Sequence, residues 1–217
     1  MFLWDVATAQ TVKRFEGHSA RVNAVAFNAD ASVVVSGSYD RSVRFWDVKG
    51  GNRRAIQVLE EATDAVQDVC VWGHEVLAGS VDGRVRTYDM RMGRVLVDCV
   101  CPAGVTGVRV SRDGAAMLVG GLDGVVRLLD RAAGGLLMAY KGHRSEGLRV
   151  RCGFAGAEKW VVSGSEEGGV WAWDLLSGQL AERLEVGGVV SCVEYAPGGR
   201  NQMACGGQDG GVVVWSE

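Results

Sequence analysis

The sequence repeats itself with an almost constant period. An aromatic or aliphatic residue followed by aspartate closes each copy, and the sites are Trp4-Asp5, Trp46-Asp47, Tyr88-Asp89, Leu129-Asp130 and Trp173-Asp174, with Trp215-Ser216 last. Successive sites are 42, 42, 41, 44 and 42 residues apart. A fixed period of this length indicates one small structural unit whose neighbours bury each other's apolar faces. Any fold for this chain must therefore be built from copies of one unit.

The phase of the repeat holds at single positions. Each of the last five copies has an acidic residue ahead of the closing pair, at Asp40, Asp82, Asp123, Glu167 and Asp209. Three residues before each acid stands glycine, at Gly37, Gly79, Gly120, Gly164 and Gly206. Three residues after each acid stands valine, at Val43, Val85, Val126, Val170 and Val212. The matches indicate a single supersecondary unit that is used five times.

Each copy contains four predicted strands. In the first copy, residues 20–27 and 32–38 are nearly continuous apolar runs, which is typical of strands buried on both faces. Residues 42–48 follow across an acidic turn, and that turn is Asp-Gly in three of the copies, the preferred chemistry for a tight hairpin. The fourth segment of each copy is more polar and is expected at an outer edge. A radially repeated four-stranded unit is a blade of an all-β propeller.

The period and the closing Trp-Asp pair are typical of WD repeats. We expect one propeller domain over residues 1–217, with a partial repeat at 1–16 and five repeats at about 17–58, 59–100, 101–141, 142–185 and 186–217. The partial repeat supplies a third strand and an outer strand, while the last repeat has no outer strand of its own. The arithmetic predicts a propeller that is incomplete at its N-terminal side.

Three segments resemble the mitogen-activated protein kinase organiser family, WD-repeat scaffolds that are also associated with the spliceosome. The segments are residues 4–28, 77–93 and 122–143, and the second contains the unusual Tyr-Asp-Met-Arg in place of Trp-Asp. Members of that family have seven blades, so the resemblance implies that two are missing here. It also implies a non-enzymatic scaffold or adaptor whose partners are kinase-cascade components, splicing factors or a prolyl hydroxylase.

Composition and charge narrow the partners and the compartment. The 23 Lys+Arg and 26 Asp+Glu residues give a net charge of −3, so we do not expect direct nucleic-acid binding. The first ten residues lack the pattern of a signal peptide, and no apolar run reaches the roughly 18 residues of a membrane span. The six cysteines are then expected to be reduced thiols. We expect a cytoplasmic and nuclear protein.

Two sets of polar residues match the hydrogen-bonded tetrad of WD repeats. They are His18, Ser36, Asp40 and Trp46 in the first full repeat, and His143, Ser163, Glu167 and Trp173 in the fourth. A catalytic triad of His18, Ser36 and Asp40 is the competing interpretation. Ser36 lies inside an apolar strand without substrate access, which favours the structural role. We predict no catalytic residue and no cofactor.

Other chemical constellations are weaker. The histidines lie far apart, and Cys99 and Cys101 form a single thiol pair, so we predict no metal site. Arg44, Arg86 and Arg127 share one phase of the repeat and are expected to lay their aliphatic stems along the Trp face.

Two short segments support a second function. Residues 46–49 and 88–91 loosely match the Trp-Asp-x-Arg/Lys ending of substrate receptors of cullin-RING ubiquitin ligases. Neither segment has the full Trp-Asp-x-Arg form, so this function is kept as the alternative to the scaffold.

The residue just before each turn acid varies from copy to copy, while its neighbours do not. Scaffold geometry therefore does not dictate its side chain, and exposed loops on rigid folds carry binding. The predicted partner surface consists of these residues together with neighbouring loop residues: Arg21, Tyr39, Val81, Leu122, Arg144, Glu146, Glu166 and Gln208.

Overall fold

The computed structural model describes residues 1–196 and 202–216, and the regular elements in these residues are all β-strands. The chain divides into two compact units, Met1–Val100 and Cys101–Glu217. The expectation of one domain over residues 1–217 stays a prediction. In the part of the chain that is described, we find no helix that is long and apolar enough to cross a membrane.

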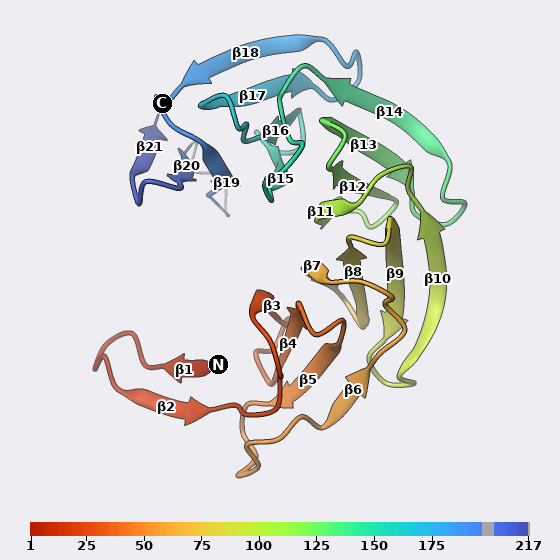
Figure 1. The fold of residues 1–217 in the computed structure, drawn as a ribbon, viewed down its shortest axis with the longest axis vertical. Coiled ribbons are helices and arrows are strands. Elements are labelled where there is room, and N and C mark those ends of the chain that lie inside the picture. The colour runs from red at the N-terminus through yellow and green to blue at the C-terminus, as the bar shows by residue number, and fades with distance from the viewer. Residues whose placement is uncertain (197–201, 217) are drawn as a thin grey trace. The chain divides into compact units, whose positions relative to one another are not determined.

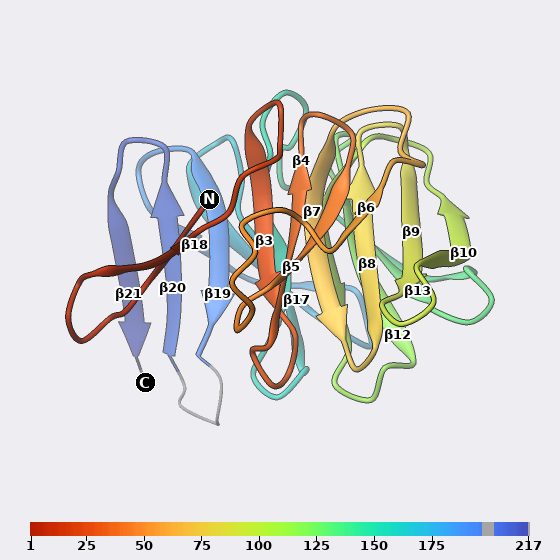
Figure 2. The same ribbon diagram turned by 90° about the horizontal axis from the view of Figure 1, so that it is seen from below.

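The first unit holds two four-stranded antiparallel sheets and one strand pair (Figure 1). The pair consists of β1 (Phe2–Trp4) and β2 (Thr11–Arg14). Blade 1 consists of β3 (Val22–Phe27), β4 (Val33–Ser38), β5 (Val43–Asp47) and β6 (Gln57–Leu59). Blade 2 consists of β7 (Val66–Trp72), β8 (Glu75–Ser80), β9 (Arg84–Asp89) and β10 (Arg94–Val100). Within each blade the strands pair in chain order, and Figure 2 shows the same strands from below.

The second unit holds two further four-stranded blades and one sheet of three strands. Blade 3 consists of β11 (Val105–Val110), β12 (Ala116–Gly121), β13 (Val125–Asp130) and β14 (Leu136–Lys141). Blade 4 consists of β15 (Cys152–Ala155), β16 (Trp160–Ser163), β17 (Gly169–Asp174) and β18 (Leu180–Glu185). Blade 5 consists of β19 (Val190–Tyr195), β20 (Gln202–Gly207) and β21 (Val212–Ser216).

The repeated glycine marks the place where the next blade approaches. A Cβ atom built on Gly37 would lie 2.6 Å from Val66 Cγ1, and one on Gly164 would lie 2.3 Å from the Val190 carbonyl oxygen. Both contacts are too short for any side chain to fit without movement of the neighbouring inner strand. Only glycine lets the inner strand of the next blade come this close to the second strand of the preceding one.

The first strand of blade 1 departs from its predicted burial. Strand β4 is buried almost throughout, but β3 is buried on one face only. Ala24 packs in the core shared with Val66 and Val69 of blade 2, while Val25 and Phe27 on the opposite face are 59% and 50% exposed. The apolar run therefore predicted the strand correctly, but the predicted burial of its second face is wrong. Composition does not reveal whether that face has a neighbour.

A polar residue at a bulge in the first strand ties neighbouring blades together. The pairing of β3 with β4 shifts between Val22 and Ala24, and the pairing of β11 with β12 shifts at the equivalent place. Asn23 Nδ2 donates to the Val66 carbonyl at 2.8 Å, and Thr106 Oγ1 donates to the Val150 carbonyl at 3.0 Å. A bulge re-aims one side chain, and here it aims at the backbone of the next blade.

Candidate functional site

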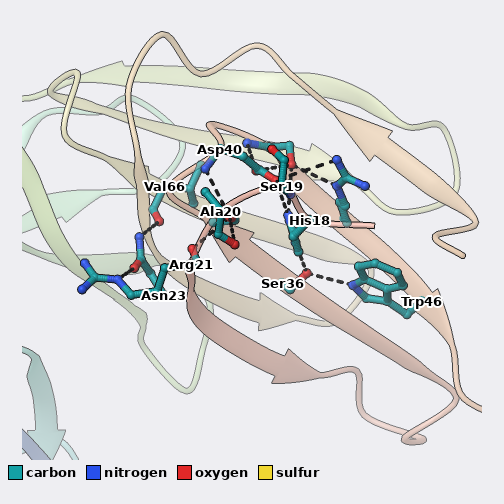
Figure 3. A network of polar contacts seen from close by, with 12 residues as sticks. His18, Ser19, Ala20, Arg21, Asn23, Ser36, Asp40, Trp46 and Val66 are labelled. Atoms are coloured by element: carbon teal, nitrogen blue, oxygen red, sulfur yellow. Dashed lines mark hydrogen bonds and ion pairs between the residues drawn. The ribbon is translucent and has the colours of Figure 1, made fainter. Parts of the chain in front are cut away.

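Four predicted residues of blade 1 form a continuous hydrogen-bonded chain (Figure 3). Trp46 Nε1 donates to Ser36 Oγ at 2.8 Å, and Ser36 Oγ lies 2.7 Å from His18 Nε2. His18 Nδ1 lies 2.8 Å from Asp40 Oδ2. One set of proton positions satisfies every member: Ser36 donates to Nε2, and a neutral His18 donates from Nδ1 to the carboxylate. This network joins two strands and two loops of one blade.

Asp40 is the acceptor on which this network converges. Its carboxylate also accepts the Ser42 hydroxyl at 2.6 Å and the Ser19 backbone N–H at 3.0 Å. Burial acts to raise the pKa of Asp40, but the hydrogen bonds from Ser42 and His18 outweigh it and hold that pKa well below its usual range. Burial lowers the pKa of His18, against the opposing effect of Asp40. The sequence analysis did not predict a role for Ser42, whose hydroxyl joins the network through Asp40.

The geometry of His18, Ser36 and Asp40 follows the order of a catalytic triad, but the site lacks access. Ser36 has no exposed surface, and its oxygen already accepts the N–H of Trp46. A nucleophile must reach a substrate carbonyl, and this hydroxyl faces only its own blade. The arrangement therefore cross-links the blade instead of performing chemistry.

The second predicted tetrad does not assemble. Trp173 Nε1 donates to the Lys141 carbonyl at 3.1 Å, and the side chain of Glu167 is exposed. His143 instead packs edge-on against the Trp173 ring at 5.4 Å, and its buried Nδ1 has no hydrogen-bond partner. Burial lowers the pKa of His143 to about 4, so the ring is neutral and behaves as an aromatic group. Ser163 is buried in the same blade without a bond to His143 among the described residues.

The neighbouring acid, Glu166, takes the anchoring role. Its Oε1 accepts the backbone N–H groups of Glu146, Gly147 and Leu148 at 2.7, 2.9 and 2.8 Å. Burial acts against it, but these three bonds lower the pKa of Glu166. Glu166 is also one of the predicted partner residues, and its role in binding a partner stays a prediction. The carboxylate is occupied by the loop that leads into blade 4, much as Asp40 holds Ser19 in blade 1.

Arginines in three blades form ion pairs with the turn aspartates. Arg86 Nη2 lies 2.9 Å from Asp82 Oδ2, and Arg127 and Asp123 make two bonds of 3.1 and 2.5 Å. Arg44 Nη2 lies 3.8 Å from Asp40 Oδ2. The expectation that the stems of these arginines lie along the Trp face stays a prediction, and the structure adds the ion pairs at their guanidinium ends. The signal in the sequence was the spacing of four residues between each turn aspartate and its arginine.

The residue before each turn acid makes the same backbone hydrogen bond in all five blades. In every blade its N–H donates to a carbonyl of the loop that precedes the inner strand, at 2.9 to 3.0 Å. The pairs are Tyr39 with Arg21, Val81 with Ala65, Leu122 with Gly104, Glu166 with Arg144, and Gln208 with Val189. A backbone bond is indifferent to the side chain, so this position is fixed in space while its chemistry varies.

The predicted partner residues differ in exposure. In the first unit, Tyr39 is 59% exposed and Arg21 is exposed, with Arg21 Nε donating to Asn23 Oδ1 at 3.0 Å, while Val81 is half-buried. In the second unit, Arg144, Glu146 and Gln208 are exposed, and Leu122 is half-buried. Arg144 and Glu146 form an ion pair of 3.3 Å on the surface. Each unit thus carries an aromatic or charged cluster at its turn ends.

The structure describes all six cysteines, and none of them is recorded in a disulfide. Within residues 1–196 and 202–216, no group of three or more His, Cys, Asp or Glu side chains is arranged to hold a metal ion.

Four-stranded antiparallel blades, the repeat glycine and the His-Ser-Trp-Asp network define this chain as a WD-repeat β-propeller protein. The family model for the WD domain, G-beta repeat, matches residues 9–47 and 183–216. The chain is similar to WD repeat domain-containing protein 83 of Rattus norvegicus, with 45% identity over 163 residues. It is similar to the human protein of the same name, with 46% identity over 163 residues.

The matched lengths limit what these relatives imply. The rat and human matches each cover 75% of this chain and 51% of the relative. A homologue of WD repeat domain-containing protein 83 from Dictyostelium discoideum is 27% identical over 247 residues, which covers all of this chain and 75% of that protein. The chain thus spans about half the length of its mammalian relatives. Folds of this class typically serve as platforms for protein interaction.

Proposed function

We propose that the chain is a non-enzymatic scaffold that assembles protein complexes through its turn residues. The observation that carries the proposal is the backbone bond repeated in all five blades, which fixes Tyr39 and its equivalents while leaving their side chains free to vary. A rigid frame that presents variable side chains is suited to recognising proteins. Tyrosine and arginine dominate interface hot spots, so Tyr39, Arg21 and Arg144 are the principal contacts.

The partner classes follow from the resemblance to the kinase-organiser family. We propose kinase-cascade components and splicing factors as partners, with a prolyl hydroxylase as a third class, and a cytoplasmic and nuclear location. Glu166 is not among the principal contacts because its Oε1 already accepts three backbone N–H groups. Val81 and Leu122 are half-buried, so less of their side chains is open to a partner.

A double substitution tests the proposal. Tyr39→Ala with Arg144→Ala removes two exposed side chains whose backbone bonds remain, so the melting temperature should not change. Affinity purification from cell extract, followed by mass spectrometry, should recover at least tenfold less of the partners captured by the unaltered chain. Arg54→Ala with Leu176→Ala is the matched control, because these residues are exposed on other loops.

Equal recovery by the double variant and by the unaltered chain would contradict the proposed surface. Recovery of a cullin-RING ligase adaptor in place of kinases or splicing factors would favour the alternative function raised by residues 46–49 and 88–91.

A further inference from the structure

The four sheet-to-sheet junctions that lie within the two units repeat one packing arrangement. In each junction, the residues three places and one place before the closing position of one repeat share a hydrophobic cluster with the closing aromatic residue of the next. One sheet therefore supplies an apolar pair, and the next sheet supplies the aromatic side chain of the same cluster. These sets are Met1 and Leu3 with Trp46, Val43 and Phe45 with Tyr88, Val126 and Leu128 with Trp173, and Val170 and Ala172 with Trp215.

Two halves of this arrangement remain exposed in the part of the chain that the structure describes. On β1, Trp4 is 57% exposed and Phe2 is 56% exposed, and the centres of their rings lie 6.3 Å apart. On β21, Val212 and Val214 are 71% and 62% exposed. Because side chains alternate along a strand, these valines point away from blade 4, against which Trp215 packs. The chain therefore carries one unmatched aromatic half and one unmatched aliphatic half.

The aliphatic face of blade 5 is shaped to receive a ring. Ala204 and Gly206 on β20 are the cross-strand neighbours of Val214 and Val212, so they share the face with the two valines. The valines thus stand beside two small residues that leave room for a bulky side chain. None of these four residues has a polar side chain, so a partner that covers them buries apolar surface alone.

The aromatic face of β1 has the complementary shape and no lone charge from its neighbouring arginine. The guanidinium carbon of Arg14 lies 5.8 Å from the centre of the Phe2 ring, and Arg14 Nε lies 2.9 Å from Glu16 Oε1. Contact with an apolar face would therefore leave this cation paired. Aromatic side chains have the largest apolar area to remove from water, so Trp4 and Phe2 gain most from a cover.

We propose that copies of this chain associate head to tail, with Trp4 of one copy packed against Val212 and Val214 of the next. A second copy is the partner because the chain itself carries both halves of a contact that its own junctions already use four times. The contact is heterologous, since each copy presents two different faces, and it can therefore add further copies. The turn residues take no part, so the inference does not depend on the proposed function.

Two face variants test the proposal in the full chain. Trp4→Lys changes the aromatic face, and Val212→Lys with Val214→Lys changes the aliphatic face; all three side chains are exposed, so the melting temperature should hold. In analytical ultracentrifugation, the mass of the unaltered chain should rise with concentration above the 23.1 kDa of one chain. Either variant should associate more weakly by roughly tenfold or more. The matched control, Leu176→Lys, changes a side chain that is 85% exposed on another loop and should associate as the unaltered chain does.

A mixture of the two face variants tests the polarity of the contact. Each variant keeps the face that the other has lost, so an equimolar mixture should form dimers with one intact contact and should grow no further. Tyr39→Ala with Arg144→Ala should associate as the unaltered chain does, which separates this contact from the turn surface.

Three results would overturn the proposal. They are a unaltered chain that stays monomeric, a Trp4→Lys variant that associates as strongly as the unaltered chain, and a mixture of the two face variants that stays monomeric. The second result is the one expected if copies join only through the edges of β21.

Discussion

At the scale of single residues, Asp40 decides whether the blade 1 network exists. It accepts bonds from His18, Ser19 and Ser42, and its removal leaves buried donors without a partner. Asp40→Ala should lower the free energy of unfolding by about 1–3 kcal/mol, the usual cost of unsatisfied buried groups. Chemical denaturation measures the change, with Asp30→Ala on an exposed turn as the control. Unchanged stability together with altered partner binding would contradict the structural role.

A second residue-scale prediction concerns acid sensitivity. Burial lowers the pKa of His143 from 6.5 to about 4. Between these two pH values the imidazole is protonated in the unfolded chain but neutral in the folded chain. The free energy of unfolding is therefore not reduced by this group above pH 6.5. It falls as the pH drops towards 4, by on the order of 3 kcal/mol in total. The pKa of His18 is lowered in the same direction.

Denaturation midpoints measured between pH 7 and pH 5 check this. The unaltered chain should lose stability over that interval, and His143→Asn should lose less of it, although it starts from a lower value. Carboxylates titrate chiefly below this window, so they do not mimic the effect. An identical slope in both proteins would show that His143 does not titrate as described.

At the scale of the element, the loop before blade 4 depends on one glutamate of an adjacent pair. Glu166 holds three backbone N–H groups of that loop, whereas Glu167 points to solvent. Glu166→Ala should therefore speed hydrogen exchange across residues 142–150, because the freed N–H groups open to water. Glu167→Ala is the matched control and should leave exchange in this loop unchanged. Equal acceleration by both variants would remove the distinction.

The turns show how one element tolerates different residues. The Asp-Gly turns of three blades place glycine at φ values of 76°, 67° and 85°, at Gly83, Gly124 and Gly210. In blade 1 the same turn position is Arg41, at a φ of 67°. The Asp40 carboxylate accepts the Ser42 N–H just beyond it, which helps hold the backbone where a side chain is disfavoured.

At the scale of the whole molecule, two strand faces leave apolar side chains open to water. Val25 and Phe27 on β3 are 59% and 50% exposed, and Val212 and Val214 on β21 are 71% and 62% exposed. Strand β21 also lies at the edge of its three-stranded sheet in the described residues. Exposed apolar edges promote association between chains.

Light scattering after size-exclusion chromatography should therefore show self-association of residues 1–217 that grows with concentration. Val212→Lys with Val214→Lys should shift the population towards monomer, because charge on an edge strand opposes pairing. Val6→Lys, at a residue that is 98% exposed, adds charge elsewhere and should change little. A strict monomer at every concentration would contradict this expectation.

The sequence by itself determined the repeating unit, its strands and the residues of the blade 1 network. These features are local: strand pairing joins neighbouring segments of one copy, so Gly37, Ser36 and Trp46 carry their roles in residue type and phase. The variable turn position was also legible, because a backbone bond leaves its side chain unconstrained.

Only the tertiary structure decided which polar groups form hydrogen bonds and how tightly the side chains of neighbouring blades pack. His143, Ser163 and Glu167 match the pattern of the intact tetrad, yet the loop backbone captures Glu166 and leaves Glu167 in solvent. The cavity beside Ala172 could not be predicted from the sequence either, because side chains of two blades line it together. Periodicity records what each copy shares, whereas packing between copies depends on where they differ.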